Sequence, residues 1–353
     1  MTTYNICVSF VGDESDKTKI FYEGTGSYIG STSKDKIKIT DTEIIIDAKR
    51  SKRSEPEDIM KNTESTIFNQ IKKGLVYYCA LTGNKKKISK VEFTLNKGNP
   101  GESNKIFEKS KLKNPLDNEI NKNLQFKSEA LNIIFEEDAK ARMLLNSLSY
   151  WLKAMSATDE GSRFEKLWRS FNAIYTYISI PLTRETNEKK KLIEVRKFIA
   201  KNSSFFPMSI GYFQSYNATT LRDIRWKELV YSQYQPGKIA EFKGLILRYK
   251  DSRMNEVFEM ILPYRRKNLS SKDLKEIEDH IEKKKTAKKT CDLELLLFHV
   301  FNYMYFLRNK YFHAEKFDTT MNILANDEHK ELAIMNDILS LFIVELINAN
   351  KVY

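Results

Sequence analysis

Three residues near the end of the chain, Arg308, Asn309 and His313, have side chains that could act together on a phosphodiester. They lie where a strongly apolar stretch runs out, and the chain contains only four histidines. A neutral imidazole can take a proton from a hydroxyl near pH 7, and a guanidinium offers forked donors that match phosphate oxygens. The set predicts a general base, His313, for a ribose 2′-hydroxyl and a cation, Arg308, for the charge that develops on phosphorus.

The spacing of these residues allows more than one arrangement on a helix. Asn309 and His313 are four residues apart and share one face, whereas Arg308 lies about 140° from His313 at roughly 100° per residue. The two side chains meet if the helix loosens near His313, if the long arginine reaches round, or if two copies of the helix face each other. The alternative interpretation is structural, because polar residues at a helix end can simply cap its carbonyls.

Composition favours a folded protein with an anionic partner. The 353 residues are 41% hydrophobic and carry a formal net charge of +12, which favours nucleic acid without specifying it. Cys7, Cys79 and Cys291 lie far apart, which argues against a disulfide framework and a zinc site. We therefore expect no cofactor and no metal. The sequence shows neither a signal peptide nor an apolar run of the roughly 20 residues that span a bilayer, so a cytoplasmic protein without a membrane partner is predicted.

The period of the apolar residues changes along the chain. Residues 1–96 alternate as strands do, with one helix expected from about Ser65 to Gly83, and predict a small α+β domain of unknown role. Residues 97–123 are rich in Gly, Pro, Asn and Lys and predict a linker. Residues 124–353 show helical periodicity and predict an all-α domain.

One of the expected helices, from about Asp292 to His313, is apolar on most of its circumference. Such a helix is buried, either in its own bundle or against a second subunit. Its aromatic residues offer the surface that pairing of two copies would bury: Phe298, Phe301, Tyr305 and Phe312.

Two segments of the helical half resemble a known family. "LRNKYFHAEK" (Leu307–Lys316) looks like the signature of the HEPN family (higher eukaryotes and prokaryotes nucleotide-binding), and "FEKLWRSFNAIY" (Phe164–Tyr175) is similar to a helix that precedes it in that family. The resemblance covers roughly residues 125–350. One departure is Ala314, because many relatives have glycine after the histidine.

The resemblance implies a helical bundle that forms a homodimer through the motif helix and cleaves RNA without a metal. Its relatives include toxins and phage-defence proteins, so a role of this kind in bacteria is expected. Arg308, Asn309 and His313 then correspond to the catalytic residues, and Lys310 and Lys316 are predicted to contact the RNA. The N-terminal domain would bind a trigger or regulator, or position the RNA. Because some relatives have lost activity, the alternative is a non-catalytic scaffold or a nucleotide- or RNA-binding module.

Other polar residues are weaker candidates. His280 and His329 are expected to be solvated, and His299 to be a satisfied histidine of the core or an interface. Asn172 lies within the upstream segment. A hydrogen bond near the site is one interpretation of it, and a buried contact between helices is the favoured one.

Overall fold

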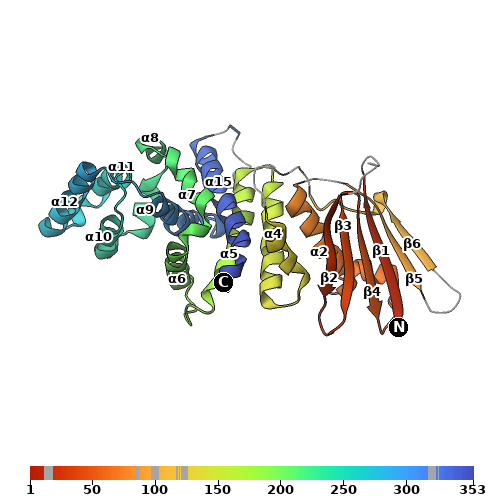
Figure 1. Ribbon diagram of the computed structural model, residues 1–353. Coiled ribbons are helices and arrows are strands. Elements are labelled where there is room, and N and C mark those ends of the chain that lie inside the picture. Colours follow the sequence, from red (N-terminus) through yellow and green to blue (C-terminus); the bar gives the residue numbers. More distant parts are fainter. Residues whose placement is uncertain are drawn as a thin grey trace. The chain divides into compact units, whose positions relative to one another are not determined.

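The computed structural model describes residues 1–11, 19–83, 87–96, 103–116, 118, 120, 126–316, 323–324 and 326–353 (Figure 1). The chain folds into two compact units, and each is assembled from separated segments. Unit 1 consists of Met1–Thr158, Arg169–Tyr177 and Ile347–Tyr353. Unit 2 consists of Asp159–Trp168 and Ile178–Leu346.

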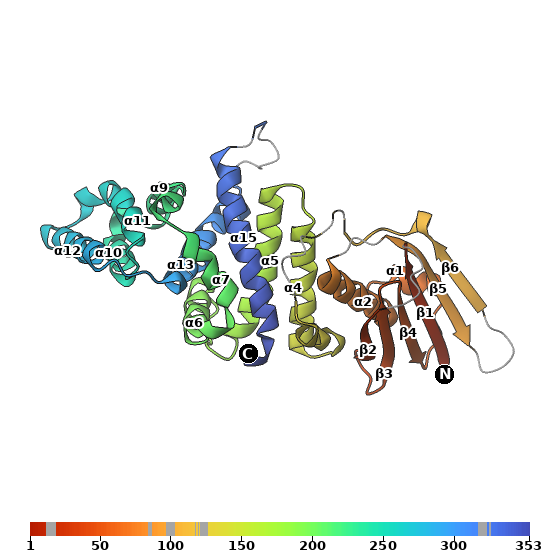
Figure 2. The same ribbon diagram turned by 45° about the horizontal axis from the view of Figure 1, so that its top comes forward.

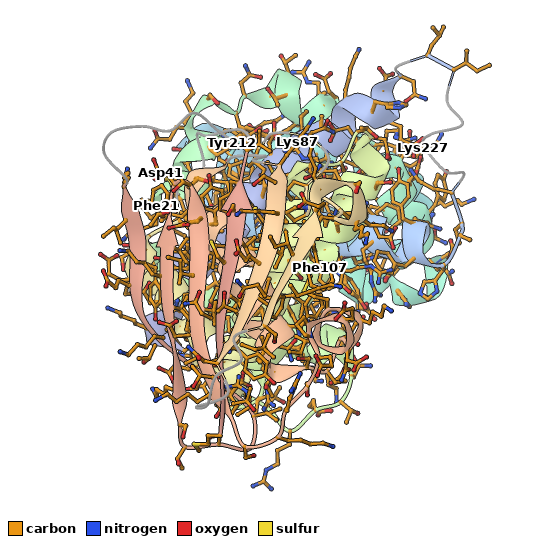
Figure 3. All side chains as sticks on the ribbon, turned by 90° about the vertical axis from the view of Figure 1, so that its right-hand side faces the viewer. Phe21, Asp41, Lys87, Phe107, Tyr212 and Lys227 are labelled. Carbon is orange, nitrogen blue, oxygen red and sulfur yellow. The ribbon has the colours of Figure 1, made fainter. Side chains whose placement is uncertain are left out.

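Unit 1 contains a six-stranded antiparallel sheet in the order β2-β3-β4-β1-β5-β6. Its edge strands carry Phe21 on β2 and Phe107 on β6 (Figure 3). The strands are β1 (Thr2–Phe10), β2 (Ile20–Ser27), β3 (Lys34–Thr40), β4 (Glu43–Arg50), β5 (Ile88–Asn96) and β6 (Ser103–Glu108).

The alternation seen in the sequence sets which face of the sheet is buried. In the central strand β1, Tyr4, Ile6 and Val8 are fully buried, and the residues between them are at least partly exposed. Ile6 lies opposite Ile46 of β4 and Phe93 of β5, so apolar side chains from three strands share one face. The strand pattern predicted for residues 1–96 is confirmed, and β3 and β4 form an antiparallel hairpin.

Helix α2 (Thr66–Thr82) lies against this apolar face beside the short helix α1 (Pro56–Lys61), as Figure 2 shows. Its predicted ends are confirmed. The Ser65 hydroxyl accepts a hydrogen bond from the Phe68 amide at 3.3 Å, and Gly83 ends the helix with φ of 66°. The helix approaches β4 closely at Gly74, where a Cβ atom would lie 3.0 Å from Ile44 Cγ2.

The first helices beyond residue 124 belong to unit 1, contrary to the predicted domain boundary, because unit 1 continues to Thr158. Helix α2 contacts both β4 and α4 (Ala139–Met155). Lys73 on α2 forms a 2.8 Å ion pair with Glu137, and the Tyr77 hydroxyl donates a hydrogen bond to Asn132 Oδ1. Because α2 has buried residues on two sides, it needs a second partner besides the sheet, and the segment from α3 (Ser128–Leu131) to α4 supplies it.

The predicted linker, residues 97–123, also contains regular structure. Strand β6 pairs with β5 there, and the 3₁₀ turn Lys109–Lys111 follows. Leu116 and Ile120 are buried. The Gly- and Pro-rich composition that suggested a linker is concentrated in 97–102, outside the described residues.

Unit 2 is helical, and the described residues from 126 onward contain no strand. An α+β N-terminal part followed by a helical part is therefore confirmed as the architecture. The helices that contribute to unit 2 are α5 (Glu160–Ser179), α6 (Glu188–Lys201), α7 (Pro207–Gly211), α8 (Ala218–Arg222), α9 (Trp226–Gln233), α10 (Ile239–Arg248), α11 (Met254–Ile261), α12 (Ser271–Ala287), α13 (Asp292–Phe298), α14 (Tyr305–Phe312) and α15 (Asp327–Asn348).

The motif helix is interrupted by a π-helical segment, His299–Met304, between α13 and α14. A π turn closes its hydrogen bonds one residue later than an α turn, and such turns often occur at functional sites. Regular periodicity predicted one uninterrupted helix, so the π segment is a correction.

The motif helix is buried within its own chain. Phe298 and Phe301 are 0% and 8% exposed. Phe298 packs on Trp226 with ring centroids 5.1 Å apart, and Phe301 packs on Phe342. These two side chains are therefore occupied by core contacts and cannot form the dimer surface predicted for them. Along the described part of the chain, we find no helix whose length and hydropathy would let it cross a bilayer.

Candidate functional site

Helix α14 ends in a Schellman motif that its own backbone supplies. The amide of Ala314 donates to the carbonyl of Tyr311 at 3.2 Å, and the amide of Glu315 donates to the carbonyl of Lys310 at 2.9 Å. Ala314 adopts a left-handed φ of 53°, as the motif requires of the residue after the C-cap, His313. Glycine is favoured at this position because it has no Cβ, and this chain places an alanine there.

The Schellman motif argues against the alternative interpretation, in which the polar side chains cap the last carbonyls of the helix. The last carbonyls accept from backbone amides, including that of His313, which donates to the Asn309 carbonyl at 3.1 Å. The His313 imidazole is exposed and makes no hydrogen bond to a described residue. Its ring is thus not used for capping.

Arg308 is held by two polar groups and one aromatic ring. Its Nη1 donates to Asn309 Oδ1 at 2.8 Å and pairs with Glu188 of α6 at 3.2 Å. The guanidinium lies 5.0 Å from the ring centroid of Phe312. With 19% of its side chain exposed, Arg308 is held in a restricted position by these three contacts. The structure brings Arg308 and Asn309 into direct contact, and no hydrogen bond joins either side chain to the His313 ring.

The two lysines predicted to contact RNA are both paired with carboxylates. Lys310 forms an ion pair with Glu315. Lys316 pairs with Glu228 at 3.3 Å and with Glu328 at 3.1 Å, and its side chain is 12% exposed. An RNA phosphate that approached these lysines would have to compete with carboxylates already in place.

The upstream segment contributes packing to the motif helix. Phe164 lies 6.0 Å from Tyr311 and Trp168 lies 6.3 Å from Tyr305 between ring centroids. Asn172 is exposed and accepts a hydrogen bond from Thr176, so the buried contact expected for it is wrong. An i, i+4 partner on its own helix is enough to satisfy it.

The other histidines differ in their surroundings. His299 is fully buried and its Nδ1 lies 2.8 Å from the Leu295 carbonyl, which confirms a core histidine. Its Nε2 is buried without a hydrogen-bond partner among the described residues, so the expectation that the ring is satisfied holds only for Nδ1. His280 was expected to be solvated, but it is half-buried and its Nε2 lies 3.0 Å from the Tyr249 carbonyl. His329 is partly exposed and bonds to Asn326 near the start of α15. In the described ranges, no group of three or more His, Cys, Asp or Glu side chains gathers as metal ligands.

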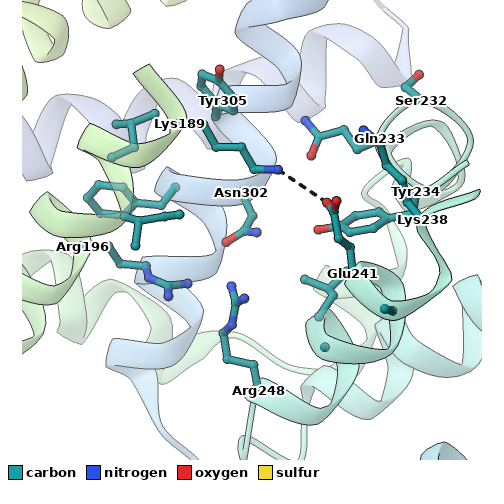
Figure 4. A pocket seen from close by; sticks show the side chains of 16 residues that line it. Lys189, Arg196, Ser232, Gln233, Tyr234, Lys238, Glu241, Arg248, Asn302 and Tyr305 are labelled. Carbon is teal, nitrogen blue, oxygen red and sulfur yellow. Dashed lines mark hydrogen bonds and ion pairs between the residues drawn. The ribbon is translucent and has the colours of Figure 1, made fainter. Parts of the chain in front are cut away.

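Sequence reasoning missed a basic pocket in unit 2. It has a volume of about 720 Å³ and is lined by α6, α10, the segment between α9 and α10, and the π-helical segment (Figure 4). Its cations are separated in sequence by up to 59 positions, from Lys189 to Arg248. The only local signal was the run Lys189–Lys191, which resembles an ordinary solvated surface.

Comparisons of the chain with protein-family models, curated proteins and solved structures find no match.

Proposed function

We propose that this chain is a metal-independent endoribonuclease of the HEPN type. The observation that carries the proposal is the end of α14. There, Arg308 is fixed by Asn309 and Glu188, and the exposed His313 ring is left out of the helix cap. A fixed cation and an accessible imidazole are the two groups that transesterification of RNA needs.

In the proposed reaction, the His313 imidazole takes the proton of a ribose 2′-hydroxyl. The 2′-oxygen attacks the adjacent phosphorus, the bond from phosphorus to the 5′-oxygen breaks, and Arg308 stabilises the charge on the phosphorane. The products are a 2′,3′-cyclic phosphate and a 5′-hydroxyl, which forms when the leaving 5′-oxygen takes a proton from a protonated His313 of the second copy. Asn309 positions Arg308 through its hydrogen bond, and Lys310 and Lys316 would contact the RNA backbone after exchanging their carboxylate partners.

The proposal includes a homodimer, because a single imidazole supplies the base but not the acid for the leaving oxygen. A twofold axis pairs the same patch of both copies. Since Phe298 and Phe301 are buried, the contact would use the exposed end of α14, where Phe312 is 36% exposed. Light scattering at micromolar concentrations tests this: a strictly monomeric protein that cleaves RNA at full rate contradicts the shared site.

The proposed setting is bacterial anti-phage defence or a toxin, with a cytoplasmic RNA as target and unit 1 available to bind a trigger or regulator. Growth arrest on expression of the wild-type protein, absent for His313→Ala, is the expected result.

The decisive test is incubation of the purified protein with mixed RNAs in EDTA. Wild-type protein should produce 2′,3′-cyclic phosphate ends, and His313→Ala and Arg308→Ala should each reduce the rate about 100-fold or more. His329→Ala is the matched control, because His329 is a partly exposed histidine outside the motif. Equal cleavage by His313→Ala and wild type, or activity that returns only with a divalent ion, would refute the mechanism.

A second candidate is a non-catalytic scaffold or RNA-binding module. The pairing of Arg308, Lys310 and Lys316 with carboxylates favours the scaffold, because these pairs reduce the charge available to a phosphodiester. A protein that neither binds nor cleaves RNA selects the scaffold, and RNA binding without cleavage, unchanged in His313→Ala, selects the binding module.

A further inference from the structure

The basic pocket of unit 2 has the size of a small-molecule site. Its volume of about 720 Å³ falls within the range of roughly 300–1,000 Å³ common for ligand pockets. None of its lining residues is Arg308, Asn309 or His313. An inference about the pocket therefore does not rest on the proposed nuclease activity.

The charge of the pocket is unbalanced. Four cations line it, Lys189, Arg196, Lys238 and Arg248, together with one carboxylate, Glu241, which gives a formal charge of +3 (four minus one). Glu241 pairs with Lys189 at 3.5 Å, as the dashed line in Figure 4 shows. Among the described residues, no carboxylate forms an ion pair with Arg196 or Arg248.

The two arginines point toward one another across the pocket (Figure 4). Arg196 is half-buried on α6, and Arg248 is exposed at the last residue of α10. Burial lowers the pKa of Arg196, and Arg248 lowers it further, while Tyr249 raises it. Two guanidinium groups that face each other without a carboxylate repel, and an anion between them would remove that repulsion.

The rest of the pocket lining is apolar or uncharged and suits the organic part of a small ligand. Leu192 and Leu245 are buried apolar residues of the wall, and Tyr305 stands at its edge (Figure 4). Asn302 in the π-helical segment is directed into the pocket, and its Oδ1 accepts a hydrogen bond from the Tyr249 hydroxyl at 3.0 Å. Its amide nitrogen is a donor on the same side chain. The pocket thus joins a cationic end, an amide and apolar walls.

We propose that this pocket binds a small organic phosphate, with Arg196 and Arg248 holding the phosphoryl group and the organic body lying against Leu192, Leu245 and Tyr305. Guanidinium groups bind phosphate oxygens through paired donors. A free nucleotide and a sugar phosphate share this chemistry, and the test distinguishes them.

The test is calorimetric titration of the full chain with four probes: adenosine 5′-monophosphate, ribose 5-phosphate, inorganic phosphate and adenosine. Binding of at least one of the two organic phosphates, with adenosine inert and inorganic phosphate at least about tenfold weaker, is expected because both parts of the pocket contribute. Preference for the nucleotide indicates that the base is recognised, and equal affinity indicates that the sugar phosphate is sufficient.

Two variants remove one charge each from the pocket. Arg196→Gln and Arg248→Gln should each weaken binding about tenfold or more, the scale for losing a hydrogen bond to a charged group. Arg248 is exposed, so its variant tests the site even if Arg196→Gln fails to fold. Lys197→Gln is the matched control, since Lys197 lies on the same helix, pairs with Glu194 and does not line the pocket.

Three results would overturn the proposal. The first is that neither organic phosphate binds at millimolar concentration. The second is that Arg248→Gln binds as tightly as the wild type. The third is that a short RNA, and no small phosphate, binds in a manner that depends on Arg248, because the pocket would then be part of an RNA site.

Discussion

Replacing Ala314 by glycine should stabilise unit 2, because this residue completes the Schellman motif in a conformation that disfavours a Cβ. Its φ of 53° places it in the left-handed region, which costs an L-residue about 1–2 kcal/mol. Glycine removes that cost, but it gains conformational freedom in the unfolded chain, which offsets about 0.4–1 kcal/mol. The net gain in the free energy of unfolding is about 0.5–1 kcal/mol, or about 1–4 °C for a unit of this size.

Calorimetric melting of the full chain measures this effect, with two controls of opposite sign. Lys288 ends α12 with a left-handed φ of 45°, so Lys288→Gly should also stabilise. Ala200 is exposed within α6, so Ala200→Gly should destabilise by about 1 kcal/mol. If Ala314→Gly destabilises as Ala200→Gly does, the residue is not left-handed in solution, and the argument that the backbone caps α14 and frees the His313 ring fails.

Three further predictions concern single side chains. Burial lowers the pKa of His299 to about 4, against about 6.5 when unfolded, so the folded state binds fewer protons between these values. The free energy of unfolding therefore decreases as pH falls through this window, by up to about 3 kcal/mol. In urea unfolding, His299→Gln should reduce this decrease, whereas His329→Gln should show the same decrease as the wild type. Asp251→Ala should lower the free energy of unfolding in urea by about 3 kcal/mol or more. Asp251 is 0% exposed and accepts hydrogen bonds from Nε and Nη2 of Arg253, which would be left without this partner. A loss below about 1 kcal/mol contradicts the burial argument. Glu188→Gln removes one of the two groups that fix the motif arginine and should lower kcat for RNA by about fivefold or less, because Asn309 still holds the guanidinium. An unchanged kcat would show that Asn309 alone positions it.

Much of unit 1 could be predicted because its signals are local. The alternation from Tyr4 to Phe10 gave a strand with one buried face, and Ser65 and Gly83 gave the ends of α2 through cap chemistry. These are interactions between residues a few positions apart. The sixth strand was missed because its pairing with β5 depends on a partner strand and not on the composition of 103–108.

The domain boundary could not be predicted for a related reason. Periodicity shows that a helix has an apolar face, but not which element covers it. Helix α4 has an apolar stripe like the helices of unit 2, yet it lies with α2, where Lys73 pairs with Glu137. The partner of a helical face is decided by shape and by specific polar contacts across the chain.

The sequence by itself determined the candidate chemistry of the motif: the identities and spacing of Arg308, Asn309 and His313, and their place at the end of an apolar helix. Tertiary structure decided the rest. It assigned Phe298 and Phe301 of that helix to the core of a single chain, placed Glu188 against Arg308, and brought Arg196 and Arg248 into one pocket. The physical reason is the sequence separation of the interacting residues, because helix periodicity and capping depend on neighbours within about five residues. Burial and charge pairing depend instead on residues that only the folded chain brings together.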